Sequence, residues 1–133
     1  MQLLAMNKQP FVLEESLGYL IGRATRSLGA LLNRNFHEAG LDVTCEQWSI
    51  LFHLGEAGGL NQQDLASLSC KDKTSMTRLI DGMESHDLVV RVPDKTDRRQ
   101  KLIYLTNKGK QFRKKLLPIV YQTLEEASKG ISL

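Results

Sequence analysis

The N-terminal third of the chain carries a long stripe of apolar residues at helical spacing. Between about residues 12 and 40, apolar side chains recur every three or four positions. They are Leu17, Leu20, Ile21, Ala24, Leu28, Leu31, Leu32 and Phe36. Gly40 is a natural end for this helix. The stripe is broader than a small domain needs from its first helix, so a partner subunit could cover part of it.

Three shorter helices are predicted next, each after a side chain that can accept hydrogen bonds from the first helical turn. The capping residues are Thr44, Asn61 and Asp72. Glycines at 55, 58 and 59 end the first of these helices, and the second is short, over 62–68. The third, to about His86, has a regular apolar face of Met76, Leu79, Ile80 and Met83. The short helix, the turn and the third helix form a helix-turn-helix.

After Leu88 the apolar period changes from helical to two. LVVRVP and KLIYLT are predicted strands, and the loop between them, 94–100, contains no apolar residue. This hairpin, 88–106, is the expected wing of a winged helix. Thr106 then caps a last helix, over about 107–133, which Pro118 should kink because its ring removes a hydrogen-bond donor. The sequence therefore predicts a mostly α (α+β) fold, with a single winged helix-turn-helix domain over 1–133.

The charge distribution sharpens this picture. The net charge is only +3, but residues 71–115 hold thirteen lysine or arginine residues against six acidic ones, while the rest of the chain is acidic. A run of charge can be an ordinary solvated face, or a surface that binds a polyanion. The wing and the helix-turn-helix both fall in this basic segment, which favours nucleic acid.

Other classes of function have little support. No apolar run approaches the roughly 18 residues that a membrane span needs, and the N-terminus lacks the pattern of a signal peptide. Cys45 and Cys70 form no disulfide framework, and the three histidines are scattered. We therefore expect a cytoplasmic protein without a metal or other cofactor, and not an enzyme.

The predicted DNA contacts lie on two structural elements. At the start of the third helix, hydroxyl and basic side chains can reach phosphates and base edges, and the helix N-terminus favours anions. The wing tip carries two arginines suited to the minor groove, and Asp97 is expected to orient one of them. The candidate residues are Gln62, Lys73, Thr74, Ser75, Thr77, Arg78, Asp97, Arg98 and Arg99. The alternative is that the hydroxyls stabilise the first turn and the basic groups are solvated.

The segment DKTSMTRLIDGMESHDLVVRVPDKTDRRQKLIYLTNKG resembles the recognition helix, wing and start of the last helix of the MarR family of bacterial regulators. The resemblance extends over roughly 14–127. It implies a homodimer held by the first and last helices, 12–40 and 107–133, with a DNA-binding lobe over 44–106. It also implies a small aromatic or phenolic effector in a crevice that Trp48 and His53 could line, although core packing explains both residues equally well.

Two features depart from the family pattern. The chain ends about where a further C-terminal helix would begin, and no cysteine stands near the start of the first helix, where oxidant-sensing members carry one. The function we expect is a sequence-specific regulator that binds duplex DNA and represses by occluding a promoter. Its operator would be pseudo-palindromic, with half-sites about 10 bp apart. The alternatives are a winged-helix module that binds another protein and, with less support, an enzyme.

Overall fold

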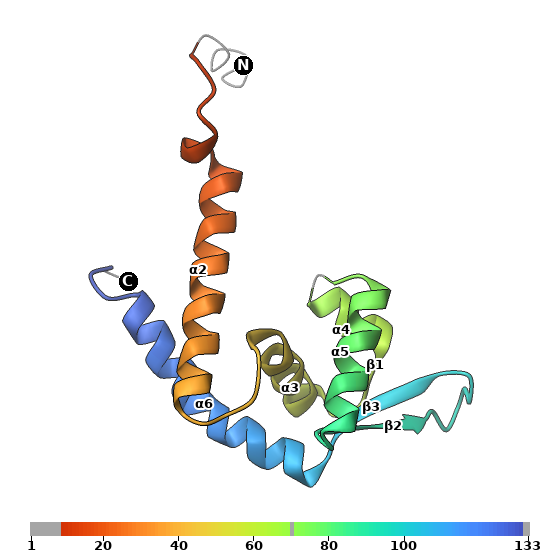
Figure 1. Ribbon diagram of the computed structural model, residues 1–133. Coiled ribbons are helices and arrows are strands. Elements are labelled where there is room, and N and C mark those ends of the chain that lie inside the picture. Colours follow the sequence, from red (N-terminus) through yellow and green to blue (C-terminus); the bar gives the residue numbers. More distant parts are fainter. Residues whose placement is uncertain (1–8, 70, 132–133) are drawn as a thin grey trace.

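The computed structural model describes residues 9–69 and 71–131 and confirms the predicted mostly α winged helix-turn-helix fold (Figure 1). In chain order the elements are η2 (Leu13–Glu15), α2 (Leu17–Glu38), α3 (Cys45–Ala57), β1 (Leu60–Asn61), α4 (Gln62–Leu68), α5 (Lys73–Ser85), β2 (Val89–Pro93), β3 (Lys101–Leu105) and α6 (Asn107–Ala127). The predicted helix-turn-helix is α4 and α5, and the predicted wing is the β2–β3 hairpin.

Side-chain caps start four of the helices where the sequence predicted them. Thr44 Oγ1 accepts the Gln47 backbone N–H, and Gln47 Oε1 accepts the Thr44 backbone N–H in return, which is a complete capping box. Asn61 caps α4, Asp72 caps α5 and Thr106 caps α6 by the same type of bond, at 2.7–2.9 Å. These local signals explain why the helix starts could be predicted closely.

The sheet has three antiparallel strands in the order β1-β3-β2. Tyr104 on β3 lies opposite Val90 on β2, and Ile103 lies between Leu60 of β1 and Arg91 of β2. Strand β1 was not predicted, because two residues are too few to show a period of two. It joins the base of the wing to the start of the helix-turn-helix.

One apolar core holds the lobe together. Its fully buried members come from α2, α3, α4, α5, β2, β3 and α6. They include Phe36, Ile50, Leu51, Leu65, Met76, Ile80, Met83, Val89, Ile103 and Leu116. The expected apolar face of α5 is therefore confirmed, with Leu79 partly buried at its edge.

One detail of the glycine pattern differs from the expectation. Gly55 lies inside α3, and Gly58 ends that helix. The φ of Gly58 is +78°, a conformation that glycine adopts more easily than other residues. At Gly55 an added Cβ would lie 2.3 Å from Arg113 Nε, so the absence of a side chain leaves room for the Arg113 side chain of α6 against α3. Pro118 lies inside α6, which is continuous across it and curves along its length (Figure 1).

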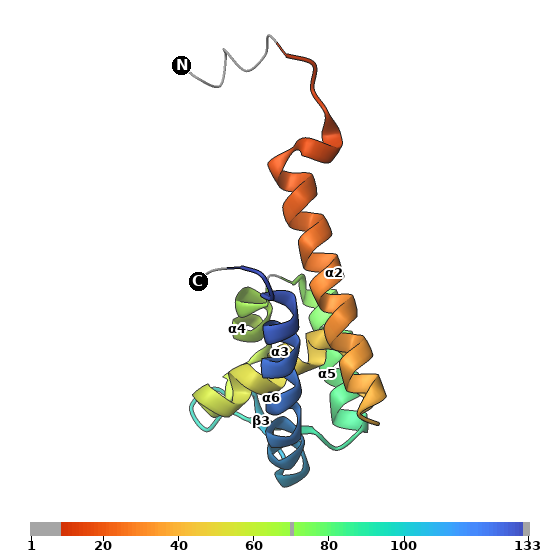
Figure 2. The same cartoon turned by 90° about the vertical axis from the view of Figure 1, so that its left-hand side faces the viewer.

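The first and last helices pack together near the end of α2. Asn35 Nδ2 donates to Thr123 Oγ1 at 2.8 Å, across α2 and α6. The N-terminal half of α2 stands clear of the rest of the chain in both views (Figures 1 and 2). Its apolar residues are exposed there, with Leu17 at 75% and Ile21 at 57%. Within the described residues, no helix is long and apolar enough to cross a membrane.

Candidate nucleic-acid interface

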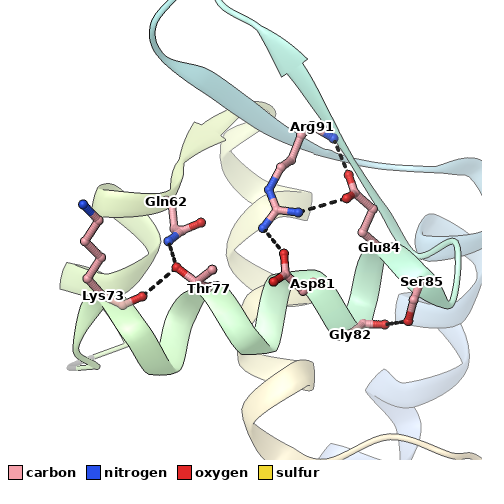
Figure 3. A network of polar contacts seen from close by, with 8 residues as sticks. All are labelled: Gln62, Lys73, Thr77, Asp81, Gly82, Glu84, Ser85 and Arg91. Carbon is pink, nitrogen blue, oxygen red and sulfur yellow. Dashed lines mark hydrogen bonds and ion pairs between the residues drawn. The ribbon is translucent and has the colours of Figure 1, made fainter.

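A hydrogen bond between side chains joins one flank of α5 to α4 (Figure 3). Gln62, the first residue of α4, donates from Nε2 to Thr77 Oγ1. Thr77 Oγ1 donates in turn to the carbonyl oxygen of Lys73, at 2.9 Å. Both Gln62 and Thr77 are half-buried. These two expected DNA contacts are therefore engaged in holding the helix pair together.

The first turn of α5 is organised around the Asp72 carboxylate. Its Oδ1 accepts the Ser75 backbone N–H at 2.8 Å, and its Oδ2 accepts the Ser75 hydroxyl at 3.0 Å. The bond from the Ser75 backbone, followed by that from its side chain, holds the pKa of the Asp72 carboxyl below its ordinary value. Asp72 is thus an ionised cap, and the Ser75 hydroxyl proton is already used.

Among the expected DNA contacts on α5, Lys73, Thr74 and Arg78 are exposed and have side chains that no hydrogen bond or ion pair of the described residues engages. Thr74 and Arg78 are four residues apart, so they lie on the same face of the helix. In the part of the chain that the structure describes, no ion pair engages Lys73 or Arg78. Their positive charges are therefore available to an anionic partner near the helix N-terminus.

The wing loop is a pair of tight turns built on two aspartates. Asp94 Oδ1 accepts from the backbone and hydroxyl of Thr96, both at 3.1 Å. Asp97 Oδ1 accepts the Arg99 backbone N–H at 3.1 Å. Asp97 is predicted to orient an arginine side chain; in the described residues its carboxylate binds the arginine backbone and shapes the turn. The side chains of Arg98 and Arg99 are exposed.

Sequence reasoning missed Arg91, which joins the wing to α5. Arg91 Nη2 lies 2.7 Å from Asp81 Oδ1, and its Nη1 lies 2.9 Å from Glu84 Oε1 (Figure 3). The Arg91 side chain is only 18% exposed. A signal existed in the sequence, because Arg91 shares its face of the strand with buried Val89, and a basic residue on an inward face needs acidic partners.

Trp48 and His53 lie in an aromatic cluster on α3. Phe52 lies between them, with ring centroids 5.6 Å from Trp48 and 6.1 Å from His53. The Arg113 guanidinium of α6 covers the Phe52 ring at 5.1 Å and pairs with Glu56 at 2.6 Å. This geometry is a cation–π contact, which anchors α6 to α3.

A cavity of about 420 Å³ lies next to this cluster, where α3, β3 and α6 meet. Its lining includes Leu54, Gly58, Tyr104, Lys110, Arg113 and Lys114. Trp48 and His53 are not among its lining residues. Apolar side chains and three basic ones line the cavity, and the Arg113 guanidinium among them is already paired with Glu56.

Cys45 is a half-buried free thiol at the start of α3. Burial raises the pKa of this thiol, and the neighbouring Glu46 carboxylate acts in the same direction. A raised pKa lowers the fraction of reactive thiolate at neutral pH. Cys70 lies outside the described residues.

The model of the MarR family matches residues 43–101, which contain the helix-turn-helix and most of the wing. The HTH-type transcriptional regulator FarR of Neisseria gonorrhoeae is 35% identical over 53% of this chain and 49% of FarR. The uncharacterized HTH-type transcriptional regulator YybA of Bacillus subtilis is 31% identical over 68% of this chain and 59% of YybA. The chain thus spans about half the length of these curated relatives.

Solved structures give the same fold over nearly the whole chain. A MarR-family transcriptional regulator from a Rhodococcus species has a TM-score of 0.81 at 27% identity, over 92% of this chain and 86% of that one. BpsR of Bordetella bronchiseptica, whose DNA binding is regulated by 6-hydroxynicotinic acid, has a TM-score of 0.85 at 22% identity, over 93% and 87%. A mutant MarR from E. coli complexed with operator DNA has a TM-score of 0.83 at 24% identity, over 92% and 89%. At these two lower identities the likeness shows the fold alone.

Proposed function

This chain belongs to the MarR family, and on that premise we propose that it is a transcriptional regulator that binds duplex DNA. The observation that carries the proposal is the exposure of two sets of basic side chains on the winged helix. Arg78 projects from α5, while Arg98 and Arg99 project from the wing tip. Phosphate contacts from such groups supply most of the affinity of a protein for DNA.

The candidate residues then divide by role. The α5 helix enters the major groove, where Thr74 and Arg78 reach base edges or phosphates and Lys73 reaches a phosphate. The wing lies along the adjacent minor groove, with Arg98 and Arg99 at its tip. Gln62, Ser75, Thr77 and Asp97 act from within the protein, because their hydrogen bonds hold α5 and the wing loop in shape.

A homodimer would place two such reading heads on one operator. The support is the exposed apolar surface of the first and last helices, with Leu17 and Ile21 on α2 and Tyr121 on α6. Exposed apolar patches of this kind mark protein interfaces. Two recognition helices related by a twofold axis read a pseudo-palindromic site with half-sites about 10 bp apart. Occupation of such a site within a promoter would repress transcription, and the protein would act in the cytoplasm.

We place the response to a small aromatic or phenolic effector near the aromatic cluster of α3. The cavity beside it touches α3, β3 and α6, so a bound effector would contact the lobe, the wing and the last helix together. Trp48 and His53 flank Phe52 on the same helix and are the residues we propose for the adjoining crevice wall. BpsR, of the same fold, responds to 6-hydroxynicotinic acid.

The experiment is DNA binding as a function of salt. Duplexes that the protein selects from a random-sequence pool, and a scrambled duplex of equal length, are titrated by fluorescence anisotropy. We expect tighter binding to the selected duplex, and an affinity that falls linearly on a log–log plot against salt. If neither duplex is bound at low salt, the proposed function is wrong, and a module that binds protein through the same basic face becomes the better interpretation.

A further inference from the structure

The polar residues on one flank of α5 form a seam along the recognition helix. Thr77, Asp81 and Glu84 lie on this flank, and two other elements reach it from outside (Figure 3). Gln62 reaches Thr77 from α4, and Arg91 reaches Asp81 and Glu84 from β2. The two halves of α5 are therefore held by different neighbours, and Arg91 holds the half nearer the wing.

Arg91 makes three hydrogen bonds across this seam. Its two terminal nitrogens bind one carboxylate each, and its backbone N–H donates to Glu84 Oε2 at 3.3 Å. A guanidinium can fork onto two acceptors in fixed directions, whereas the ammonium of lysine is a point charge. The position of β2 relative to α5 is therefore specified in direction as well as in distance.

Because Arg91 lies near the end of β2, its contacts with α5 affect the position of the wing loop. Strand β2 ends at Pro93, two residues later, and the wing loop begins at Asp94. A small rotation of β2 about α5 would thus move the wing tip, with Arg98 and Arg99, through a larger distance. Simultaneous contacts to two grooves require that the helix and the wing keep one fixed relative orientation.

We propose that Arg91 is a positioning residue for DNA recognition, which fixes the wing relative to the recognition helix through Asp81 and Glu84. This inference rests on the proposed function, since it assumes that α5 and the wing contact DNA together. Arg91 itself does not contact the DNA in this proposal. Its effect passes through two acidic side chains that, by charge alone, would repel the phosphate backbone.

Asp81 and Glu84 should weaken DNA binding through their charge and strengthen it through their contacts with Arg91, and a substitution of both can separate the two effects. The double variant Asp81→Asn with Glu84→Gln removes two negative charges from the recognition helix. If charge alone mattered, this variant would bind any duplex more tightly. If Arg91 acts as a positioning residue, the selected duplex is bound more weakly, while the scrambled duplex is bound as well as before or better. The two interpretations therefore predict opposite signs for the same measurement.

The Arg91 variants complete the set. We expect Arg91→Ala to weaken binding of the selected duplex by about tenfold, equivalent to 1.4 kcal/mol. Arg91→Lys keeps the charge without the fork and should recover only part of this loss. The matched control is Lys101→Ala, which removes an exposed positive charge from the neighbouring strand and should reduce affinity for both duplexes alike. In the background of the double acid variant, Arg91→Ala should add little, because its partners are already lost.

Thermal unfolding of every variant is measured beside binding, so that loss of fold is recognised. If Arg91→Ala is unfolded at the assay temperature, the double acid variant and Arg91→Lys carry the test alone. The inference is overturned if the double acid variant binds the selected duplex as tightly as the wild type or more tightly. It is also overturned if Arg91→Ala and Lys101→Ala behave alike. Failure of the wild-type protein to bind either duplex is a different result, which removes the proposed function.

Discussion

Gln62 Nε2 donates a hydrogen bond to Thr77 Oγ1, and this contact joins the first residue of α4 to the second turn of α5. Because both side chains are half-buried, the bond is partly shielded from bulk water. Replacement of Gln62 by alanine leaves Thr77 with the Lys73 carbonyl as its remaining partner. The bond therefore adds a polar contact between the two helices of the helix-turn-helix to the apolar packing of Leu65 and Met76.

We predict that Gln62→Ala lowers the free energy of unfolding by about 1 kcal/mol, the usual net contribution of such a bond. Urea denaturation followed by circular dichroism measures the change. Gln63→Ala is the matched control, since it removes the same side chain from an exposed neighbouring position and should cost little. Equal effects of the two substitutions would show that the Gln62–Thr77 bond does not contribute.

Replacement of two glycines by alanine should change the stability of the fold in opposite directions. At Gly109, in the first turn of α6, an added Cβ would lie 2.1 Å from the Leu88 carbonyl oxygen, which belongs to the backbone and cannot move aside cheaply. We predict that Gly109→Ala destabilises the fold by roughly 1–3 kcal/mol, as overpacking does. At Gly82, inside α5, an added Cβ meets nothing within 4 Å.

Gly82→Ala should therefore stabilise the protein by roughly 0.5–1 kcal/mol, because alanine loses less conformational freedom in a helix than glycine. Thermal melts of both variants beside the wild type are sufficient. A gain at Gly82 and a loss at Gly109 are expected. A loss at both positions would contradict the free space beside Gly82.

The third prediction concerns the pH dependence of the α5 cap. The pKa of Asp72 is lowered below its ordinary 3.8, first by the hydrogen bond from the Ser75 backbone and then by that from the Ser75 hydroxyl. A carboxyl with a lowered folded-state pKa contributes stability that is fully present above its unfolded-state pKa. This stability is lost as the pH falls through the folded-state pKa.

Asp72→Ala should therefore destabilise the protein at neutral pH, and its difference from the wild type should shrink as the pH falls below the ordinary carboxyl pKa. Asp72→Asn is the control, because an asparagine oxygen can still cap the helix but does not titrate. Urea midpoints at a series of pH values give the answer. A difference between Asp72→Ala and the wild type that stays constant down to the lowest pH would contradict an ionised cap.

Much of this architecture could be predicted from local patterns. Caps at Thr44, Asn61, Asp72 and Thr106 and the change of period after Leu88 depend on neighbours in sequence, and all of them are found where expected. Strand β1 could not be predicted, because it exists only through its pairing with β3.

The candidate site was predictable as a segment but not in its internal bonds. From the sequence, the hydroxyls of Ser75 and Thr77 are expected to be free. In the fold, Ser75 binds Asp72, and Thr77 binds both Gln62 and the Lys73 carbonyl. Arg91 was missed because its partners lie seven and ten positions away, on a different element. The strand alternation places Arg91 on the face of Val89, but which acidic residues pair with it depends on tertiary packing, which a period or a motif does not show.

The exposed apolar surface of α2 gives the last prediction, on assembly. Leu17 and Ile21 are four residues apart and therefore share one face of the helix. Leu17 is 75% exposed and Ile21 is 57% exposed. The N-terminal half of α2 stands clear of the lobe (Figure 2). Substitution there should thus leave the fold of one protomer intact, while two charges placed in a dimer interface would be desolvated without partners.

We predict that Leu17→Glu combined with Ile21→Glu converts a dimer to a monomer in sedimentation equilibrium, with little change in helix content. The control is Arg26→Glu combined with Ala30→Glu, which adds two glutamates at the same spacing to exposed positions on the opposite face of α2 and should stay dimeric. A protomer that binds through one half-site loses the contribution of the second, so the monomeric variant should bind the selected duplex far more weakly than the control variant does. A wild-type protein that sediments as a monomer at the concentrations that bind DNA would contradict the proposed homodimer, and the two reading heads would then have to be recruited one at a time.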